Sequence, residues 1–280
     1  MTTILVLGAT GKTGRRLTPL LSAVGHQVRR ASRRPTADVR FDWADTASFG
    51  PAVEGVDGLY LVGPDFVEDP SEQVAQLLDL ASSAGVGQVV ALSSLGLTFP
   101  GEPADSGRRR TEDAITASGL RWTLLRPGGF MQNFSEGFLL PGVLEGTVRT
   151  ATGNGSTALV DTADIAAVAA SALAHDHHAG RALALTGPEA LTFDQAAAAI
   201  GRASGRPVAH QRIDDEEFTA MLAGVGAPED YVAMLLRDQV AIRDGHAAEV
   251  SDDVEQVTGR PPVSFSAYTS ATVETWRAPG

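Results

Sequence analysis

The sequence predicts an α/β protein built on a doubly wound parallel sheet of the Rossmann type, with a smaller and mostly helical C-terminal lobe. Two observations carry this prediction. The apolar run at residues 4–7 leads directly into the glycine-rich stretch 8–14 and then into a helical stretch, which is the strand, turn and helix order of a dinucleotide-binding cradle. Downstream, short strand-like and helix-like stretches alternate, as they do in βαβ units.

The predicted elements follow from apolar patterning and from turn residues at their ends. Strands are expected at residues 4–7, 27–31, 39–41, 58–62, 89–92, 122–125 and 182–185. Helices are expected at residues 15–23, 72–84, 112–118, 165–174, 193–203, 214–244 with a break at 224–228, and 265–276. We expect residues 1–130 to form the cofactor-binding core. Residues 131–280 should add sheet and helix elements and a helical substrate lid, within one compact unit.

Composition restricts the class of protein. The chain has 280 residues, of which 43% are hydrophobic and 20% charged, so it can bury a large core. It has no cysteine, which excludes disulfides and thiolate catalysis. A net charge of -12 argues against direct nucleic-acid binding. Without a basic leader or an apolar run of ~18 residues, we expect no membrane anchor and a cytoplasmic protein.

The glycine-rich stretch spaces its glycines as G-x-x-G-x-x-G, at Gly8, Gly11 and Gly14. Glycine lets a backbone turn sharply and approach a pyrophosphate closely, and the N–H groups at the start of a helix attract phosphate. The predicted strand before this stretch and the predicted helix after it favour a cofactor cradle. The alternative is a tight strand-to-helix turn that binds nothing.

The residues after the second predicted strand decide which dinucleotide fits. NAD-binding cradles place an acidic residue there, whereas this chain has Ser32, Arg33 and Arg34. Guanidinium groups match phosphate oxygens, so these residues favour the 2′-phosphate of NADP(H). The alternative is a solvated basic surface, because Arg29 and Arg30 belong to the same run.

Asp42 and Trp43 follow the third predicted strand. They are candidates to border the adenine, through a hydrogen bond and an apolar contact. Asp42 is equally suited to cap a turn. No metal site is expected, because the histidines at residues 175–178 end a helix, where cationic side chains suit the helix dipole.

Several motifs together resemble the NmrA-like family of atypical short-chain dehydrogenases. They are Gly-Ala-Thr-Gly-Lys-Thr-Gly-Arg at 8–15, Ser-Ser at 93–94, Arg-Thr-Glu at 110–112, Leu-Arg-Pro-Gly at 125–128, Phe-Met-Gln-Asn-Phe at 130–134 and Leu-Thr-Gly-Pro-Glu at 185–189. The resemblance covers nearly the whole chain and implies a Rossmann fold that binds NADP(H). The family includes quinone reductases, reductases of ergot-alkaloid type that act on an iminium, and members that sense the nicotinamide redox state.

The resemblance also implies roles for individual residues. On the pyrophosphate it places Gly8, Thr10, Gly11, Lys12, Thr13 and Gly14. Beside the nicotinamide ribose it places Gly63 and Pro64, and facing the nicotinamide Ser93 and Ser94. For the substrate side it implies Phe130, Met131, Asn133 and Phe134, although aromatic residues and methionine are as often ordinary core.

The Tyr-x-x-x-Lys motif of ordinary short-chain dehydrogenases is absent. Lys12 is the only lysine and lies in the glycine-rich stretch, and the tyrosines are Tyr60, Tyr231 and Tyr268. Arg108 stands where relatives often carry histidine or lysine, and arginine does not release its proton near neutral pH. No proton donor is therefore assigned, and Ser93, Ser94 and Arg108 remain the catalytic candidates.

These features favour an NADPH-dependent reductase that transfers hydride to a small activated acceptor. An iminium needs no proton from the protein and a quinone can take one from water, so both suit a site without a positioned acid. Enones belong to the same class, and a role in specialised metabolism is expected. The alternative is a non-catalytic NADP(H) sensor that binds a protein partner. The sequence leaves the oligomeric state open.

Overall fold

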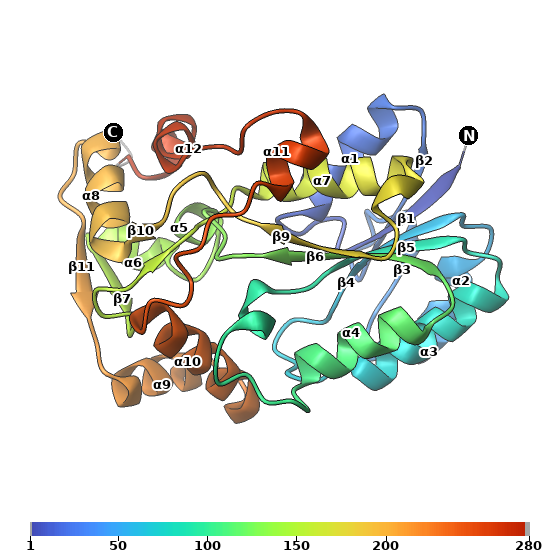
Figure 1. The fold of residues 1–280 in the computed structure, drawn as a ribbon, viewed down its shortest axis with the longest axis horizontal. Helices are drawn as coiled ribbons and strands as arrows, with labels where there is room; N and C mark the ends of the chain where they lie inside the picture. The colour runs from blue at the N-terminus through green and yellow to red at the C-terminus, as the bar shows by residue number, and fades with distance from the viewer. Residues whose placement is uncertain (1, 278–280) are drawn as a thin grey trace. The chain divides into compact units, whose positions relative to one another are not determined.

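The structure is a computed structural model that describes residues 2–277 (Figure 1). Internal contacts divide the chain into two units. Unit 1 comprises Met1–Ser94, Pro103–Pro127 and Thr162–Ala184, and unit 2 comprises Leu95–Glu102, Gly128–Asp161 and Leu185–Gly280. The chain thus passes between the units several times, whereas the sequence predicts a single boundary at residue 130.

Unit 1 is built on a seven-stranded sheet, and all seven predicted strands are present. The strand order is β3-β2-β1-β4-β5-β6-β9, and the five pairings from β3 to β6 are parallel. The strands are β1 (Thr3–Leu7), β2 (Gln27–Ser32), β3 (Val39–Arg40), β4 (Gly58–Val62), β5 (Gln88–Leu92), β6 (Arg121–Pro127) and β9 (Arg181–Leu185). The order reverses between β1 and β4, and such reversals open a ligand crevice at the carboxyl ends of the strands.

Helices cover both faces of this sheet, as Figure 1 shows. Helices α1 and α7 pack together on one face, and α2, α3 and α4 lie on the other. Their bounds are α1 (Gly14–Ala23), α2 (Phe49–Val53), α3 (Ser71–Ser83), α4 (Gly107–Ala117) and α7 (Thr162–Ala174). Because both faces are buried, strands such as β1 and β4 are almost continuously apolar.

Helix α4 begins earlier than the sequence predicts, at Gly107 rather than at Glu112. Ser106 caps its N-terminus, where the serine side chain accepts a hydrogen bond from the backbone N–H of Arg109 at 3.3 Å. The first turn carries three consecutive arginines and therefore shows no apolar periodicity. That turn brings Arg108 to the same end of the sheet as the glycine-rich stretch.

Unit 2 combines two small sheets with short helices. Strands β7 (Thr147–Thr150) and β11 (Ala209–Arg212) pair in parallel, and β8 (Ser156–Thr157) pairs antiparallel with β10 (Leu191–Thr192). The helices are α5 (Asn133–Glu136), α6 (Leu140–Glu145), α8 (Phe193–Ser204), α9 (Asp215–Gly224), α10 (Glu229–Arg243), α11 (Asp253–Thr258) and α12 (Phe265–Thr272). A capping box of Thr192 and Gln195 starts α8 where the sequence predicts it. No helix within residues 2–277 is long and apolar enough to cross a membrane.

Phe134 lies at the centre of the unit 2 core and is fully buried. Its ring packs against Phe193 and Phe265, with centroids 5.9 and 5.6 Å away. Its carbonyl oxygen accepts a hydrogen bond of 2.8 Å from the indole Nε1 of Trp276. These contacts tie α5 to α8, α12 and the segment that follows α12.

We therefore expect Phe134→Ala to destabilise the protein by about 3–5 kcal/mol, the usual loss for a buried phenylalanine. Phe138 is 58% exposed, so Phe138→Ala is the matched control and should change stability by less than about 1 kcal/mol. Denaturant unfolding of both variants measures the difference. Similar losses in the two variants would contradict this account of the core.

Candidate cofactor and active site

The glycine-rich stretch between β1 and α1 needs its glycines for separate reasons. Gly8 has a φ of +60°, which favours glycine, and its carbonyl oxygen accepts a hydrogen bond of 2.8 Å from the N–H of Gly11. A Cβ atom on Gly14 would lie 2.4 Å from that oxygen and 2.9 Å from the Cα of Ala9. Helix α1 can approach the end of β1 this closely only because residue 14 has no side chain.

The start of α1 is suited to an anion. Thr13 occupies its N-cap position and makes no side-chain capping hydrogen bond. The positive end of the helix dipole therefore faces the glycine turn, as in pyrophosphate-binding cradles. The residues present thus fit a dinucleotide. Tyr60 on β4 is fully buried, and burial raises the pKa of its hydroxyl, so Tyr60 stays protonated.

Replacing Gly14 by alanine should force the helix away from β1. We expect Gly14→Ala to cost about 1–3 kcal/mol of stability and to weaken NADPH binding, because the backbone must move to admit the methyl group. The control is Gly50→Ala in α2, where a Cβ atom meets nothing within 4 Å; it should be neutral or slightly stabilising. Thermal unfolding and cofactor titration compare the two variants. Equal behaviour would refute the close-packing role of Gly14.

The basic run at the end of β2 divides into two pairs. Arg29 donates to the carbonyl oxygen of Ala52 at 3.2 Å, and Arg30 forms a bidentate pair with Asp38 at 2.8 and 3.0 Å. Arg33 and Arg34 are exposed, and neither side chain makes a hydrogen bond or ion pair within the described chain. The four arginines therefore do not form one uniform solvated surface. Two are used within the fold, and two remain available to a phosphate at the carboxyl end of β2.

Asp42 and Trp43 serve the local fold in this structure. An Asp42 carboxylate oxygen accepts a hydrogen bond of 3.1 Å from the N–H of Ala44, so Asp42 caps a turn. The Trp43 indole donates to the carbonyl oxygen of Val62 at 3.2 Å, and its ring meets Phe41 edge-on. These contacts hold the segment after β3 against the end of β4. The adenine contact of both residues stays a prediction.

The carboxyl ends of β5 and β6 carry a hydrogen-bonded cluster. The Ser93 hydroxyl donates to Glu112 at 2.5 Å, and Arg126 donates to the same carboxylate through Nε at 2.9 Å and Nη2 at 2.5 Å. The bond to Glu112 raises the pKa of Arg126. Nearby, Arg108 donates weakly to Ser94 at 3.5 Å. All three candidate catalytic residues are thus connected to α4. Arg108 belongs to this helix, and Ser93 and Ser94 are hydrogen-bonded to its residues Glu112 and Arg108.

The loop after β4 holds a residue that sequence reasoning missed. It begins with Gly63 and Pro64, and at Phe66 the backbone takes a φ of +59° although the residue is not glycine. The Phe66 side chain is 53% exposed. Beyond it the loop is attached to α4, because Glu68 accepts a 3.1 Å hydrogen bond from the N–H of Gly107. A bulky residue in this backbone region is strained, and such strain clusters at ligand-binding sites.

Removing the strain should stabilise the protein. Asparagine tolerates positive φ, so we expect Phe66→Asn to raise the free energy of unfolding by about 1 kcal/mol. Phe138→Asn replaces another exposed phenylalanine without positive φ and should bring no gain. Denaturant unfolding of the two variants gives the comparison. A loss of stability in Phe66→Asn would mean that the ring makes contacts that outweigh the strain.

The predicted substrate residues lie in unit 2. Met131 and Phe134 are 1% and 0% exposed and belong to its core cluster, so burial favours the structural role for both. Phe130 and Asn133 are half-buried and keep part of their surface accessible. Their contact with a substrate stays a prediction. The two accessible side chains are the stronger candidates.

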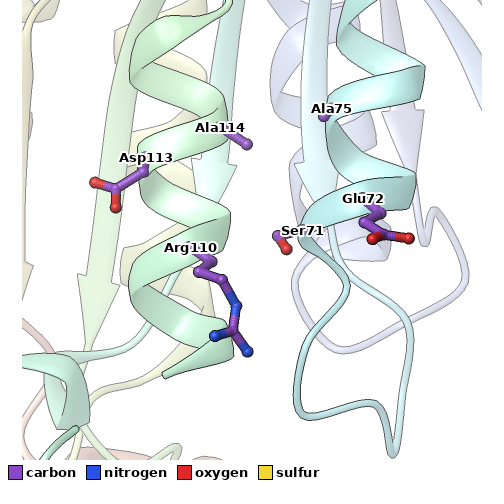
Figure 2. A pocket seen from close by; sticks show the side chains of 6 residues that line it. All are labelled: Ser71, Glu72, Ala75, Arg110, Asp113 and Ala114. Atoms are coloured by element: carbon purple, nitrogen blue, oxygen red, sulfur yellow. The ribbon is translucent and has the colours of Figure 1, made fainter. Parts of the chain in front are cut away.

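A shallow groove of about 310 Å³ lies between α3 and α4, on the side of unit 1 drawn in Figure 2. Ala75 and Ala114 point toward each other across it, while Asp113 points away from α3. Ser71, Glu72 and Arg110 complete its lining. The ion pair between Arg110 and Asp69 at 2.8 Å engages the only cation among these lining residues. The groove offers none of the glycine-turn geometry found after β1.

The comparisons with known proteins agree with this geometry. Residues 8–176 match the family model for NAD(P)H-binding proteins. The chain is 36% identical to the uncharacterized oxidoreductase YesF of Bacillus subtilis, over 98% of this chain and 96% of that protein. It is 35% identical to the (4-alkanoyl-5-oxo-2,5-dihydrofuran-3-yl)methyl phosphate reductase of Streptomyces griseus, over 97% and 98% of the two chains.

Solved structures give the same result. The Escherichia coli NADPH-dependent quinone oxidoreductase in complex with NADPH superposes with a TM-score of 0.80 at 28% identity, over 96% of this chain and 99% of that chain. The regulator NmrA in complex with NAD has a TM-score of 0.74 at 18% identity, over 98% and 95%, and shows the shared fold. This chain belongs to the NAD(P)H-binding family, and its resemblance to NmrA-like proteins is confirmed. It is an NAD(P)H-dependent oxidoreductase.

Proposed function

We propose that the protein is an NADPH-dependent reductase of a small, planar, electron-poor acceptor such as a quinone, an enone or an iminium, with a role in specialised metabolism. The observation that carries the proposal is the combination of two unengaged arginines after β2 with a site in which we assign no titratable side chain, among residues 2–277, as a proton donor. The names of the relatives, oxidoreductase and reductase, favour catalysis over the sensor alternative.

Separate parts of unit 1 would hold the two ends of the cofactor. The glycine turn and the start of α1 would bind the pyrophosphate, and Arg33 and Arg34 the 2′-phosphate. The bound cofactor supplies the hydride. Ser93 and Ser94 would line the nicotinamide end, where the carboxyl edge of the sheet orients the reacting groups.

Tyr60 and Tyr268 do not replace the missing acid. Tyr60 is fully buried, and the Tyr268 hydroxyl donates to Ser135 at 2.7 Å within the unit 2 core. Arg108 and Arg126 carry guanidinium groups, which do not release protons near neutral pH. An acceptor that is already cationic, or that takes its proton from water, suits such a site.

Arg33→Ala should weaken NADPH binding by about 1–3 kcal/mol, the strength of a charge-assisted hydrogen bond, and leave NADH binding nearly unchanged. The control is Arg30→Ala, because Arg30 belongs to the same run and is already paired with Asp38. It should leave the preference for NADPH intact. Titration of each protein with both cofactors makes the measurement. Equal affinity of the wild-type protein for NADPH and NADH would overturn the cofactor assignment.

A second expectation concerns the missing acid. Ser94→Ala and Arg108→Ala should each lower kcat by no more than about 100-fold, because they lose orientation rather than a proton donor. The profile of kcat against pH should have the same shape in both variants as in the wild-type protein, because neither variant loses an acidic group that takes part in catalysis. The measurement needs an acceptor found by screening quinones, enones and imines. A loss beyond about 10⁴-fold in a folded variant that still binds NADPH would contradict the proposal.

A further inference from the structure

The Ser93 hydroxyl donates its only hydrogen bond to Glu112. Ser93 Oγ lies 2.5 Å from Glu112 Oε1, and an ionised carboxylate can only accept, so the hydroxyl is the donor of this bond. A hydroxyl has one proton and two lone pairs. Once the proton is directed at Glu112, Ser93 can offer only lone pairs to any other group.

Glu112 is fixed in that role by Arg126. The guanidinium donates to both carboxylate oxygens, through Nε at 2.9 Å and Nη2 at 2.5 Å. The Glu112 side chain is 8% exposed and that of Arg126 is 25% exposed. Such bidentate pairs are strong and geometrically specific, and they need the ionised carboxylate. Glu112 on α4 is therefore held between the ends of β5 and β6 with its charge compensated.

We propose that Glu112 is a positioning residue that makes Ser93 a hydrogen-bond acceptor toward the substrate. This inference rests on the proposed function, in which Ser93 lines the nicotinamide end. In this proposal Glu112 acts through Ser93, by accepting the hydrogen bond that the serine hydroxyl donates. Arg126 holds the carboxylate in place through two hydrogen bonds.

The substrate class follows from this polarity. A group that meets Ser93 must donate a hydrogen bond, as the N–H of a protonated imine or amidine does. A carbonyl oxygen offers only lone pairs and would face the lone pairs of Ser93. The arrangement thus favours a planar substrate with an N–H⁺ donor over a ketone or a quinone oxygen at this position.

Ligand binding tests the polarity without catalysis. Benzamidine and benzoate have similar shapes, but benzamidine presents N–H donors and benzoate presents only acceptors. Each is titrated into the protein saturated with NADP⁺, using calorimetry. Wild type should bind benzamidine more tightly than benzoate. Ser93→Ala should lower the affinity for benzamidine about 10-fold and leave the affinity for benzoate unchanged, because one hydrogen-bond acceptor is removed without a change of charge.

Glu112→Gln should also lower the affinity for benzamidine. The glutamine amide can donate a hydrogen bond to Ser93 Oγ, and the serine hydroxyl can then donate to another group instead of accepting. The double variant Ser93→Ala, Glu112→Gln should be no weaker than Ser93→Ala, because Glu112 acts through the serine; additive losses would show an independent role. Asp113→Asn removes a neighbouring, exposed charge from the same helix and should change neither affinity. Glu112→Asp keeps the charge but shortens the side chain, and should be intermediate.

The proposal is overturned if Ser93→Ala leaves benzamidine binding unchanged or weakens benzoate instead. Ser93→Ala alone decides this if Glu112→Gln does not fold, because it leaves the pair with Arg126 intact. Failure of the proposed function would look different. The protein could bind both ligands with the expected pattern and yet fail to oxidise NADPH with any acceptor in the screen. That result would leave the Ser93 polarity standing and contradict the reductase assignment.

Discussion

The contact between the Gly8 carbonyl and the first turn of α1 is the constraint on which the cofactor site depends. A Cβ atom at residue 14 would lie 2.4 Å from that oxygen, so only glycine lets the helix start directly above the end of β1. Because the helix start has no side-chain cap, a phosphate can take the place of one there. The parallel order of the strands brings the ends of β2 and β5 to the same edge.

Residues that are distant in the sequence therefore lie along the same edge of the sheet. Arg33 and Arg34 supply unengaged positive charge at one end, while Ser93, Glu112 and Arg126 form a charge-compensated cluster at the other. The first end is suited to an anionic phosphate. The second gives no proton away, because its hydroxyl is held by a carboxylate and its cation is a guanidinium. In the proposed function, the residues that bind the phosphate and those beside the reacting groups would lie apart along one sheet edge.

Much of the fold could be predicted from the sequence, because buried parallel strands are apolar runs and glycine turns have few alternatives. The strand pairing of β7 with β11 could not, since these strands are short, polar and about 60 residues apart. For the site, the sequence identifies Arg29 to Arg34 as one basic run, but only side-chain partners separate Arg30 from Arg33. The strain at Phe66 and the burial of Met131 likewise depend on tertiary packing. The role of Glu112 depends on α4 placing it beside β5.

The central claim is that unit 1 delivers hydride from NADPH to an acceptor that needs no proton from the protein. The most direct test measures steady-state NADPH oxidation by the wild-type protein with a planar iminium and with an unactivated ketone of the same ring size. The account predicts that kcat/KM for the iminium exceeds that for the ketone by at least roughly 100-fold, the smaller end of what a positioned acid contributes. Comparable values for the two acceptors would contradict it.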